Sequence, residues 1–460
     1  MKNASTTTLV HLQSSTTNSL KNGHSLLALT ALLLCGLAIP TTAETTINKV
    51  AREQGFTIPA NVTTPIVLKT SPGAVCDLHA EGEDGPEQSL TVYANVDGYV
   101  KFHARPLQEA EESSRVQLDC SDAKGKVTRY PVKVRAASSP TADMPAPTLS
   151  EMPTPTGSTV RPALSEQEQQ TLSNEELVSR GYPERPDAVD SPDRYALWQK
   201  RVSRSITILP SQSADSGKSH HKAQAASDNV IWSGYVSDSS RHSYQAVSGT
   251  WHVPEVVEHY SSSPTYSVFW VGLDGYGDTD LLQAGTEQDS VESGGTNYYV
   301  YRSWYEIVPN EYMQYTQLNP NAGDDVMVEV WICCGSGNSP NVNGTYFEFT
   351  ITDWTQNIEI ELVNPLSLGG TVYNGNTVEW IMERPTINGS LPYFADYDYA
   401  DMIPSADSTT LGWVSWNKLP DLIQLWMYNF GEVGGGDNNQ LSGAYNHGST
   451  DINYVWYNFH

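Results

Sequence analysis

The pattern of apolar residues between Asn229 and His460 constrains the fold of this chain most strongly. Short runs of alternating apolar and polar residues recur there, separated by Gly, Asn and Asp. Alternation with a period of two is typical of β-strands that bury one face, and no stretch of note has helical periodicity. The predicted strands are Tyr244–Val253, Thr265–Val271, Tyr298–Ile307, Asp325–Ile332, Tyr346–Asp353, Ile358–Val363, Thr377–Met382 and Leu422–Asn429. Residues 229–460 are therefore expected to form an all-β domain, a large two-sheet antiparallel sandwich of the jelly-roll or concanavalin-like kind.

The first 43 residues carry the features of a signal peptide. The apolar run Ser25–Ala38 is too short to span a membrane comfortably, and small residues ending at Ala43 follow it. We therefore predict a secreted, extracellular protein whose mature chain begins near Glu44. No later segment is apolar enough to cross a membrane.

Residues 44–135 alternate short β-rich runs with Gly, Asp and Pro turns. This pattern predicts a small β-sandwich of immunoglobulin-like type. Cys76 and Cys120 both lie in this part, and we expect them to form a disulfide because export permits one. A plain structural or adhesive module is the simplest interpretation of this domain.

Residues 136–228 are expected to link the two β-domains. The first part is rich in Pro, Ser and Thr, whereas Ser165–Ser205 has helical composition and includes the basic residues Arg201 and Arg204. Two interpretations stay open: a detachable pro-segment that complements the charge of the acidic domain, or a solvated linker that contains a helix. If it is a pro-segment, we expect activating cleavage between Arg204 and Asp228, where the sequence is of low complexity.

The charge of the chain limits its partners and its working conditions. The net charge is −27, which argues against nucleic acid and anionic membranes as partners. From Asn229 onward the only Lys or Arg residues are Arg241, Arg302, Arg384 and Lys418. The repulsion among the carboxylates would largely vanish near their reference pKa of about 4, so an acid-working protein is indicated, although a salt-adapted one would also have this composition.

The remaining cysteines and the histidines suggest no metal site. Cys333 and Cys334 are adjacent, so a vicinal disulfide, two thiols and an intermolecular link all stay open. No group of residues has metal-ligand spacing, and we expect neither a metal nor another cofactor.

Four short segments place Gln or Glu among aromatic residues in predicted strands. They are Phe269–Gly275, Leu281–Gly285, Ser303–Glu306 and Val378–Glu383. A carboxylate can activate a water molecule, and an amide can stabilise an oxyanion. If these side chains share one face of a sheet, they provide two requirements of acyl-transfer hydrolysis.

The order of these segments resembles the glutamic peptidases, the eqolisins of peptidase family G1, over residues 229–460. The resemblance implies a sandwich of two large antiparallel sheets with a Gln/Glu dyad on a concave face. It also implies pepstatin-insensitive endopeptidase activity at acid pH on polypeptide substrates. Position by position, the dyad falls on Gln283 and Glu379. The residues that would line or support the site are Trp270, Asp274, Trp304, Tyr305 and Glu306.

Each dyad residue has a distinct expected role. Glu379 would act as general base on a bound water and later return the proton to the leaving amine. Gln283 would hold that water and donate an amide N–H to the tetrahedral oxyanion. An amide keeps its donors at low pH because it does not titrate. We expect such an enzyme to act as a monomer.

Two other classes of function remain open from the sequence. A glycoside hydrolase on a similar sandwich would use two carboxylates, such as Glu306 and Glu379, as acid and base. A lectin-like module would use the aromatic residues of a concave face to bind polysaccharide or peptide without catalysis. Replacement of Gln283 by Ala separates these classes, because it should abolish peptide hydrolysis, leave a two-carboxylate glycosidase partly active and barely affect the stability of a lectin.

Overall fold

The computed structural model describes residues 55–80, 88–107, 114–137, 152–211, 231–239, 243–257, 263–309, 311–333, 343–366, 373–429, 440–446 and 450–457, and the backbone of residues 221–222. The predicted signal peptide, Cys334 and most of the expected activation stretch lie outside these ranges. Within them, no helix combines the length and apolar character needed to cross a membrane.

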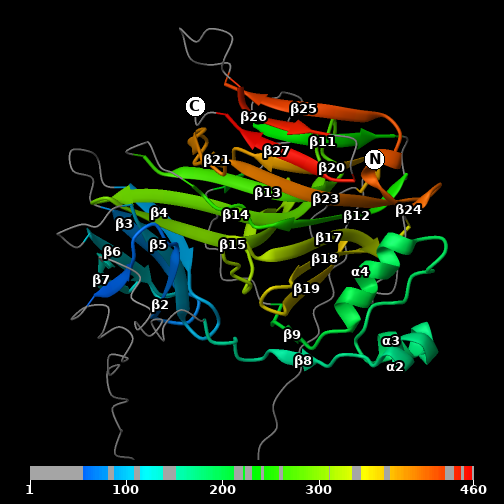
Figure 1. Cartoon of the computed structure of the whole chain (residues 1–460), viewed down its shortest axis with the longest axis horizontal. Coiled ribbons are helices and arrows are strands. Elements are labelled where there is room, and N and C mark those ends of the chain that lie inside the picture. Colours follow the sequence, from blue (N-terminus) through cyan, green and yellow to red (C-terminus); the bar gives the residue numbers. More distant parts are fainter. Residues whose placement is uncertain are drawn as a thin grey trace, which may run out of the picture. The chain divides into compact units, whose positions relative to one another are not determined.

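The C-terminal part forms two large, mostly antiparallel sheets, which confirms the predicted sandwich (Figure 1). The front sheet has the order β25-β11-β20-β13-β14-β15, with β16 and β5 on the far side of β15. Its strands are β11 Trp232–Asp238, β13 Thr265–Leu273, β14 Leu281–Ser293, β15 Thr296–Val308, β16 Glu311–Tyr315, β20 Thr377–Glu383 and β25 Leu422–Tyr428. Two short pieces, β21 Thr386–Ile387 and β22 Tyr393–Phe394, follow β20.

The back sheet has the order β26-β27-β23-β12-β17-β18-β19, and β25 joins it to the front sheet by pairing with both β11 and β26. Its strands are β12 Tyr244–His252, β17 Asp325–Cys333, β18 Tyr346–Asp353, β19 Ile358–Pro365, β23 Tyr399–Ser408, β26 Gln440–Tyr445 and β27 Ile452–Trp456. Strand β24, Gly412–Ser415, pairs with β23, and the short 3-10 helix η2, Trp416–Lys418, follows it.

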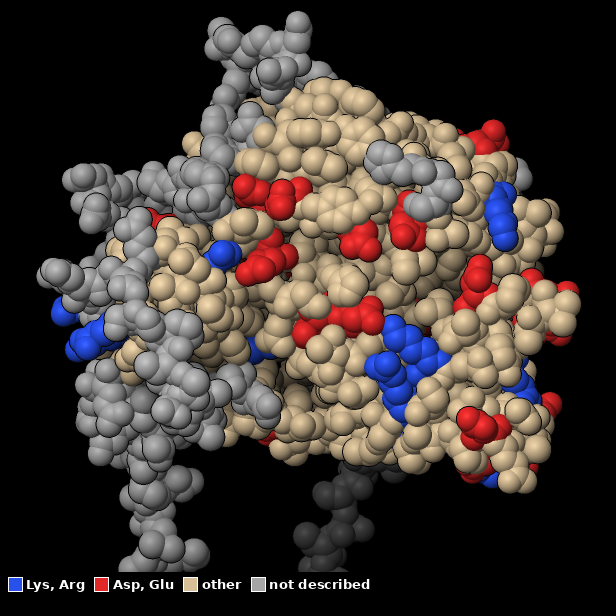
Figure 2. All heavy atoms as spheres, in the orientation of Figure 1, with Lys and Arg blue, Asp and Glu red and all other residues tan. Residues whose placement is uncertain are grey.

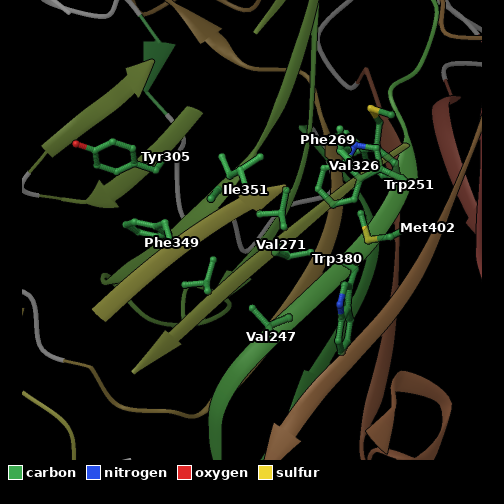
Figure 3. Packing of buried hydrophobic residues seen from close by; sticks show 14 of the residues in the cluster. Val247, Trp251, Phe269, Val271, Tyr305, Val326, Phe349, Ile351, Trp380 and Met402 are labelled. Carbon is green, nitrogen blue, oxygen red and sulfur yellow. The ribbon is translucent and has the colours of Figure 1, made fainter. Parts of the chain in front are cut away.

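The core of the sandwich comes from the faces that the two sheets turn toward each other (Figure 3). Val271 and Trp380 of the front sheet pack in one cluster with Val326 and Phe349 of the back sheet, and all four side chains are buried. Each fully buried side chain of this size contributes about 1.5–3 kcal/mol relative to an exposed one. Alternation along each strand leaves the second face of the front sheet free to carry other chemistry.

The hairpin of β14 and β15 is longer than the predicted strands, with 13 residues in each arm. Gly294 and Gly295 form its turn with φ angles of 55° and 69°, a left-handed conformation that glycine adopts without strain. The β14 arm carries Glu287, Gln288 and Asp289, all buried. The sequence predicted this strand only over Leu281–Gly285, because the polar residues of its continuation to Ser293 do not alternate with apolar ones.

The N-terminal part forms a five-stranded sheet of order β1-β7-β6-β3-β4. Its strands are β1 Phe56–Pro59, β3 Val75–Ala80, β4 Gln88–Tyr93, β6 Ser114–Ser121 and β7 Val127–Ala137. The N-terminal part has two further strands outside this sheet, β2 Thr64–Lys69 and β5 Tyr99–Pro106. Cys76 and Cys120 form a disulfide between directly paired positions of β3 and β6, within a single sheet. An immunoglobulin disulfide joins two sheets, so the immunoglobulin-like character of this part is not confirmed.

Strands β2 and β5 extend the front sheet. β5 pairs antiparallel with the Thr296–Tyr299 end of β15, and β2 pairs with β5. The apolar core of the N-terminal part includes Val291, Tyr298 and Val300 from the long hairpin. The two β-rich parts therefore share both a sheet and a core.

The expected helical segment lies between them in sequence and covers the outer face of the back sheet (Figure 1). It comprises β8 Thr159–Arg161, α2 Glu166–Thr171, α3 Asn174–Ser179, α4 Pro192–Val202 and β9 Ile206–Ile208. Ser165 and Ser173 begin α2 and α3 with capping boxes, in which Glu168 and Glu176 return the hydrogen bond. Strand β9 pairs in parallel with the edge strand β19, so the segment continues the back sheet.

Candidate active site

Strand register places Gln283 and Glu379 on one face of the front sheet. Gln283 of β14 and Glu379 of β20 are both directly opposite Gly272 of β13, which lies between them. Directly opposite residues of antiparallel strands point to the same face. A Cβ atom at Gly272 would lie 3.3 Å from Oε2 of Glu379 and 2.8 Å from Cδ1 of Leu281. The absence of a side chain at Gly272 therefore keeps the space between the Gln283 amide and the Glu379 carboxyl open.

Glu306 of β15 extends this row on the other side of Gln283. Nε2 of Gln283 donates a hydrogen bond to Oε2 of Glu306 over 2.8 Å, which orients the amide. Among the described residues, Oε1 of Gln283 and Oε2 of Glu379 are buried without a hydrogen-bond partner. Buried polar atoms of this kind cost about 1–3 kcal/mol each, a penalty that a bound water or a substrate amide would relieve.

The environment of Glu379 favours its neutral form. Burial raises the pKa of its carboxyl well above the ordinary value, and the nearby charge of Asp274 adds to the effect. The backbone N–H of Tyr276 donates to Oε1 over 3.4 Å. The covered site therefore makes this carboxyl harder to ionise than an exposed glutamate.

Asp274 holds the backbone that leads into Glu379. Its carboxylate accepts hydrogen bonds from the backbone N–H groups of Asn374, Gly375 and Asn376 over 2.6, 3.0 and 2.8 Å. Asp274 itself has a left-handed φ of 62° at the end of β13. This side chain therefore positions the segment before β20 and does not itself lie in the row with Gln283.

We expect Asp274→Ala to destabilise the protein by about 3 kcal/mol, because three backbone donors lose a buried acceptor. The matched control is Asp421→Ala, since Asp421 also has a left-handed φ, of 48°, but is exposed. Urea unfolding of both variants separates loss of the carboxylate from backbone strain. Equal destabilisation of the two variants would show that the three hydrogen bonds contribute little.

Two of the predicted aromatic residues lie on the same face as the dyad. Trp270 and Trp304 are both opposite Gly285, one row along the sheet from Gln283, and both are fully buried. Nε1 of Trp270 donates to Oε2 of Glu383 over 2.8 Å. The two indoles thus form the apolar floor beside the dyad.

Tyr305 does not line this face, which corrects the expectation from the sequence. It stands between Trp304 and Glu306 in a strand, so its side chain must point to the opposite side of the sheet. There it packs in the sandwich core, with its ring 5.2 Å from the ring of Phe349 (Figure 3). Trp304 and Glu306 therefore lie on the face of the dyad, whereas Tyr305 between them lies on the core face of the sheet.

Glu383 was not predicted as part of the site. It follows Glu379 by four residues on β20 and shares its face, a relation that a period of two would have revealed. Burial raises the pKa of Glu383 to about 8, although the hydrogen bond from Trp270 opposes the shift. The residue is therefore a neutral, buried hydrogen-bond acceptor next to the floor of the site.

The raised pKa of Glu383 predicts that stability falls as pH rises. The folded state keeps its proton up to about pH 8, whereas the unfolded chain releases it near pH 4.5. Unfolding therefore releases a proton between these values, which lowers stability by up to about 1.4 kcal/mol per pH unit. We expect urea unfolding to show a steeper decline from pH 5 to 7 in the wild type than in Glu383→Gln. Parallel curves for the two proteins would contradict this assignment.

The dyad is covered in this form of the chain, and Gln283 and Glu379 have no exposed surface. Strand β10, His221–Lys222, pairs antiparallel with β21 and also contacts β16. Since β21 follows β20 and β16 lies beyond β15, β10 bridges these two parts of the front sheet. A cavity of about 410 Å³ lies elsewhere, lined in part by Lys101, Asn319 and residues of the linker at Met152–Pro155.

The described residues contain no group of three or more His, Cys, Asp or Glu side chains arranged to hold a metal ion. Cys333 is buried, while its neighbour Cys334 is outside the described ranges.

Similarity to known proteins is found in the C-terminal part of the chain. No curated protein sequence matches the chain. Residues 230–420 match the Peptidase A4 family. The chain is similar to a solved structure of scytalido-glutamic peptidase with a peptide-based transition state analogue, with 20% identity, a TM-score of 0.37, and coverage of 49% of this chain and 98% of the other. It is also similar to SCP-B, a member of the eqolisin family in complex with a tripeptide, with 20% identity, a TM-score of 0.35 and the same coverage. The match over residues 230–420 supports a glutamic-type peptidase of the Peptidase A4 family, the eqolisins, in the C-terminal part of this chain.

Proposed function

We propose that this protein is a secreted, pepstatin-insensitive acid endopeptidase that cleaves polypeptides with Gln283 and Glu379 and is made as an inactive precursor. The observation that carries the proposal is the row in which the amide and the carboxyl face each other across Gly272. The sequence supports secretion through the apolar run before Ala43.

Catalysis begins with a water molecule held between Glu379 and Gln283. The ionised carboxylate of Glu379 takes a proton from this water as the oxygen attacks the peptide carbonyl. Glu379 then gives the proton to the leaving amine when the tetrahedral intermediate collapses. The same carboxyl therefore serves as base and as acid, and no histidine is needed.

Gln283 stabilises the negative charge of the intermediate. Its Nε2 has two N–H groups, of which one donates to Glu306. The second N–H remains for the oxyanion, and the bond to Glu306 fixes its direction before the reaction starts. Because an amide does not titrate, this donor works equally well at low pH.

The covered dyad supports the assignment of the described form to a precursor. Burial raises the pKa of Glu379, and a protonated carboxyl has no capacity to accept a proton from water. Displacement of β10 would admit water to the face and lower the pKa of Glu379 toward its ordinary value. Uncovering the site then produces the base that the reaction requires.

The helical segment is docked on the opposite side of the sandwich by buried ion pairs. Arg201 binds Glu359 through Nε and Nη2 over 2.7 and 2.8 Å, and Arg161 binds the same carboxylate over 2.7 Å. Burial alone would raise the pKa of Glu359, but the two guanidinium groups hold it well below its usual range. Basic and acidic side chains also lie side by side on the molecular surface in Figure 2.

This docking favours activation by cleavage of the chain over release by acid. Glu359 stays ionised in mild acid, so the ion pairs with Arg201 and Arg161 persist there. We infer that cleavage between Arg204 and Asp228 uncovers the dyad, while the charge-complementary segment stays on the back sheet. The two interpretations of this segment, pro-segment and linker, thus apply to different parts of it.

We expect acid-incubated wild type to digest a denatured protein only toward the acid end of pH 2–7, with pepstatin present, and Gln283→Ala to be about 100–1000-fold slower. The matched control is Gln288→Ala. Gln288 is also buried on β14 but points to the other face, where its Nε2 donates to Thr286. The control should keep its activity apart from any loss of folded protein.

Two results would contradict the proposed function. A processed wild type that cleaves no protein at any pH would leave only the fold, and glycan binding would then be tested. A Gln283→Ala variant with unchanged activity would exclude the dyad, and retained activity on glycans would favour the two-carboxylate mechanism with Glu306 and Glu379.

A further inference from the structure

The face that carries the dyad continues along β14 and β15 beyond the catalytic row. Glu287 and Asp289 follow Gln283 on the same face of β14, and Arg302 is opposite Glu287 on β15. Arg302 pairs with Glu287 over 2.8 Å and also with Asp289, and all three side chains are buried. One guanidinium group is therefore shared by two carboxyl groups beneath a cover.

The cover is the edge of the N-terminal sheet. Nη1 of Arg302 donates to the backbone carbonyl of Thr91 in β4. The ring of Tyr93 lies 4.6 Å from the ring of Tyr315, which is paired with Trp304 in the front sheet. Strand β4 thus crosses the dyad face one to two rows beyond the floor of the site.

Two side chains of this edge point toward the site. Tyr93 of β4 and Val75 of β3 are directly opposite each other, so they share one face of the N-terminal sheet. Both pack against the apolar cluster that includes Trp270, Trp304 and Leu281. Tyr93 is 8% exposed, and Val75 is half-buried.

The N-terminal sheet is held firmly in this position. Besides the pairing of β5 with β15, Oγ of Ser114 and the hydroxyl of Tyr298 lie 2.6 Å apart in a buried hydrogen bond. The backbone N–H of Val96 donates to Oε1 of Gln317 over 2.8 Å. None of these contacts involves the residues between Arg204 and Asp228, so cleavage there leaves them intact.

We propose that the N-terminal β-sheet forms one end wall of the substrate cleft, and that Tyr93 and Val75 determine specificity there. The proposal rests on the proposed peptidase function. Glu287 is four residues from Gln283, a distance of about 13 Å along the strand. A peptide laid along β14 from the dyad therefore has space for about four extended residues before it meets the wall.

The chemistry of the wall selects apolar substrate side chains. Tyr93, Val75, Trp304 and Tyr315 present mainly carbon surface, and the charge of Arg302 is compensated by its two carboxylates. A charged substrate side chain at this end would lose its hydration without gaining a free partner. The wall therefore favours bulky apolar residues a few positions from the cleaved bond.

The test compares the cleavage-site profiles of acid-processed wild type, Tyr93→Ala and Tyr99→Ala on a peptide library. Tyr99 belongs to the same N-terminal part and is half-buried, but stacks with Lys69 away from the dyad face. We expect Tyr93→Ala to lose about 10-fold in preference for bulky apolar residues at the positions on the wall side. Tyr99→Ala should keep the wild-type profile, and all processed samples should retain the N-terminal fragment on size exclusion.

A second variant keeps the test decisive if Tyr93→Ala does not fold. Val75→Phe adds a ring at a half-buried position and should shift the preference toward smaller residues at the same substrate positions. The wall would be rejected if both folded variants kept the wild-type cleavage-site profile, or if the N-terminal fragment separated and the profile did not change. The proposed peptidase function would be unaffected by either result. Two other outcomes would instead overturn the dyad on which the wall depends. One is that wild type does not cleave the library, and the other is that Glu379→Gln still cleaves it.

Discussion

Glu379→Gln is expected to lose peptidase activity by at least about 100–10,000-fold, the range over which a general base contributes to catalysis. The amide has the shape of the carboxyl, so it fits the same row opposite Gly272. It has no basic oxygen that accepts a proton from water and returns it to the amine. The loss is measured as the rate at which each protein digests a denatured protein in acid. The enzyme concentrations are determined by a method that does not depend on activity.

The control for this variant is Glu348→Gln, which makes the same change at a buried glutamate of the back sheet. Burial raises the pKa of Glu348 to about 7, so its electrostatic situation resembles that of Glu379. We expect the control to retain activity. Cleavage by Glu379→Gln at the rate of this control would exclude Glu379 as the base.

Arg201→Ala is expected to destabilise the protein by about 3–5 kcal/mol, because it leaves buried Glu359 without its bidentate partner. Arg201 also contacts Glu361 over 2.9 Å, so a second carboxylate loses its cation. The matched control is Arg180→Ala. Arg180 and Glu168 form an exposed pair over 3.6 Å, for which we expect a loss of about 0–1 kcal/mol.

The effect of Arg201→Ala should depend on pH with a defined sign. The lowered pKa of Glu359 stabilises the folded state above the unfolded value of about 4.5, and this contribution is lost as pH falls toward the folded value. Urea unfolding should therefore show a larger difference between variant and wild type at pH 6 than at pH 3. A difference that grows on acidification would contradict the ion-pair explanation.

The sequence alone determined the class of fold, and it led to the prediction of Gln283 and Glu379 as the reacting groups. A period of two repeated from Asn229 onward leaves few solutions other than stacked sheets, because each strand must bury its apolar face. The dyad was predicted because the motifs around Gln283 and Glu379 follow each other in the order found in the glutamic peptidases, and because an amide and a carboxyl are suited to peptide hydrolysis. The capped helices of the middle segment also follow from local signals at Ser165 and Ser173.

Tertiary structure alone decided which of these residues meet. Glu306 joins Gln283, and Tyr305 leaves the site, because strand register and the side of the sheet are set by pairing between distant segments. The buried pairing of Arg302 with Asp289 turned a polar stretch into a strand that local propensity does not predict. The position of Tyr93 beside the floor of the site depends on strand pairing and a core shared across about 200 residues of sequence, and such non-local packing leaves no periodic mark in the chain.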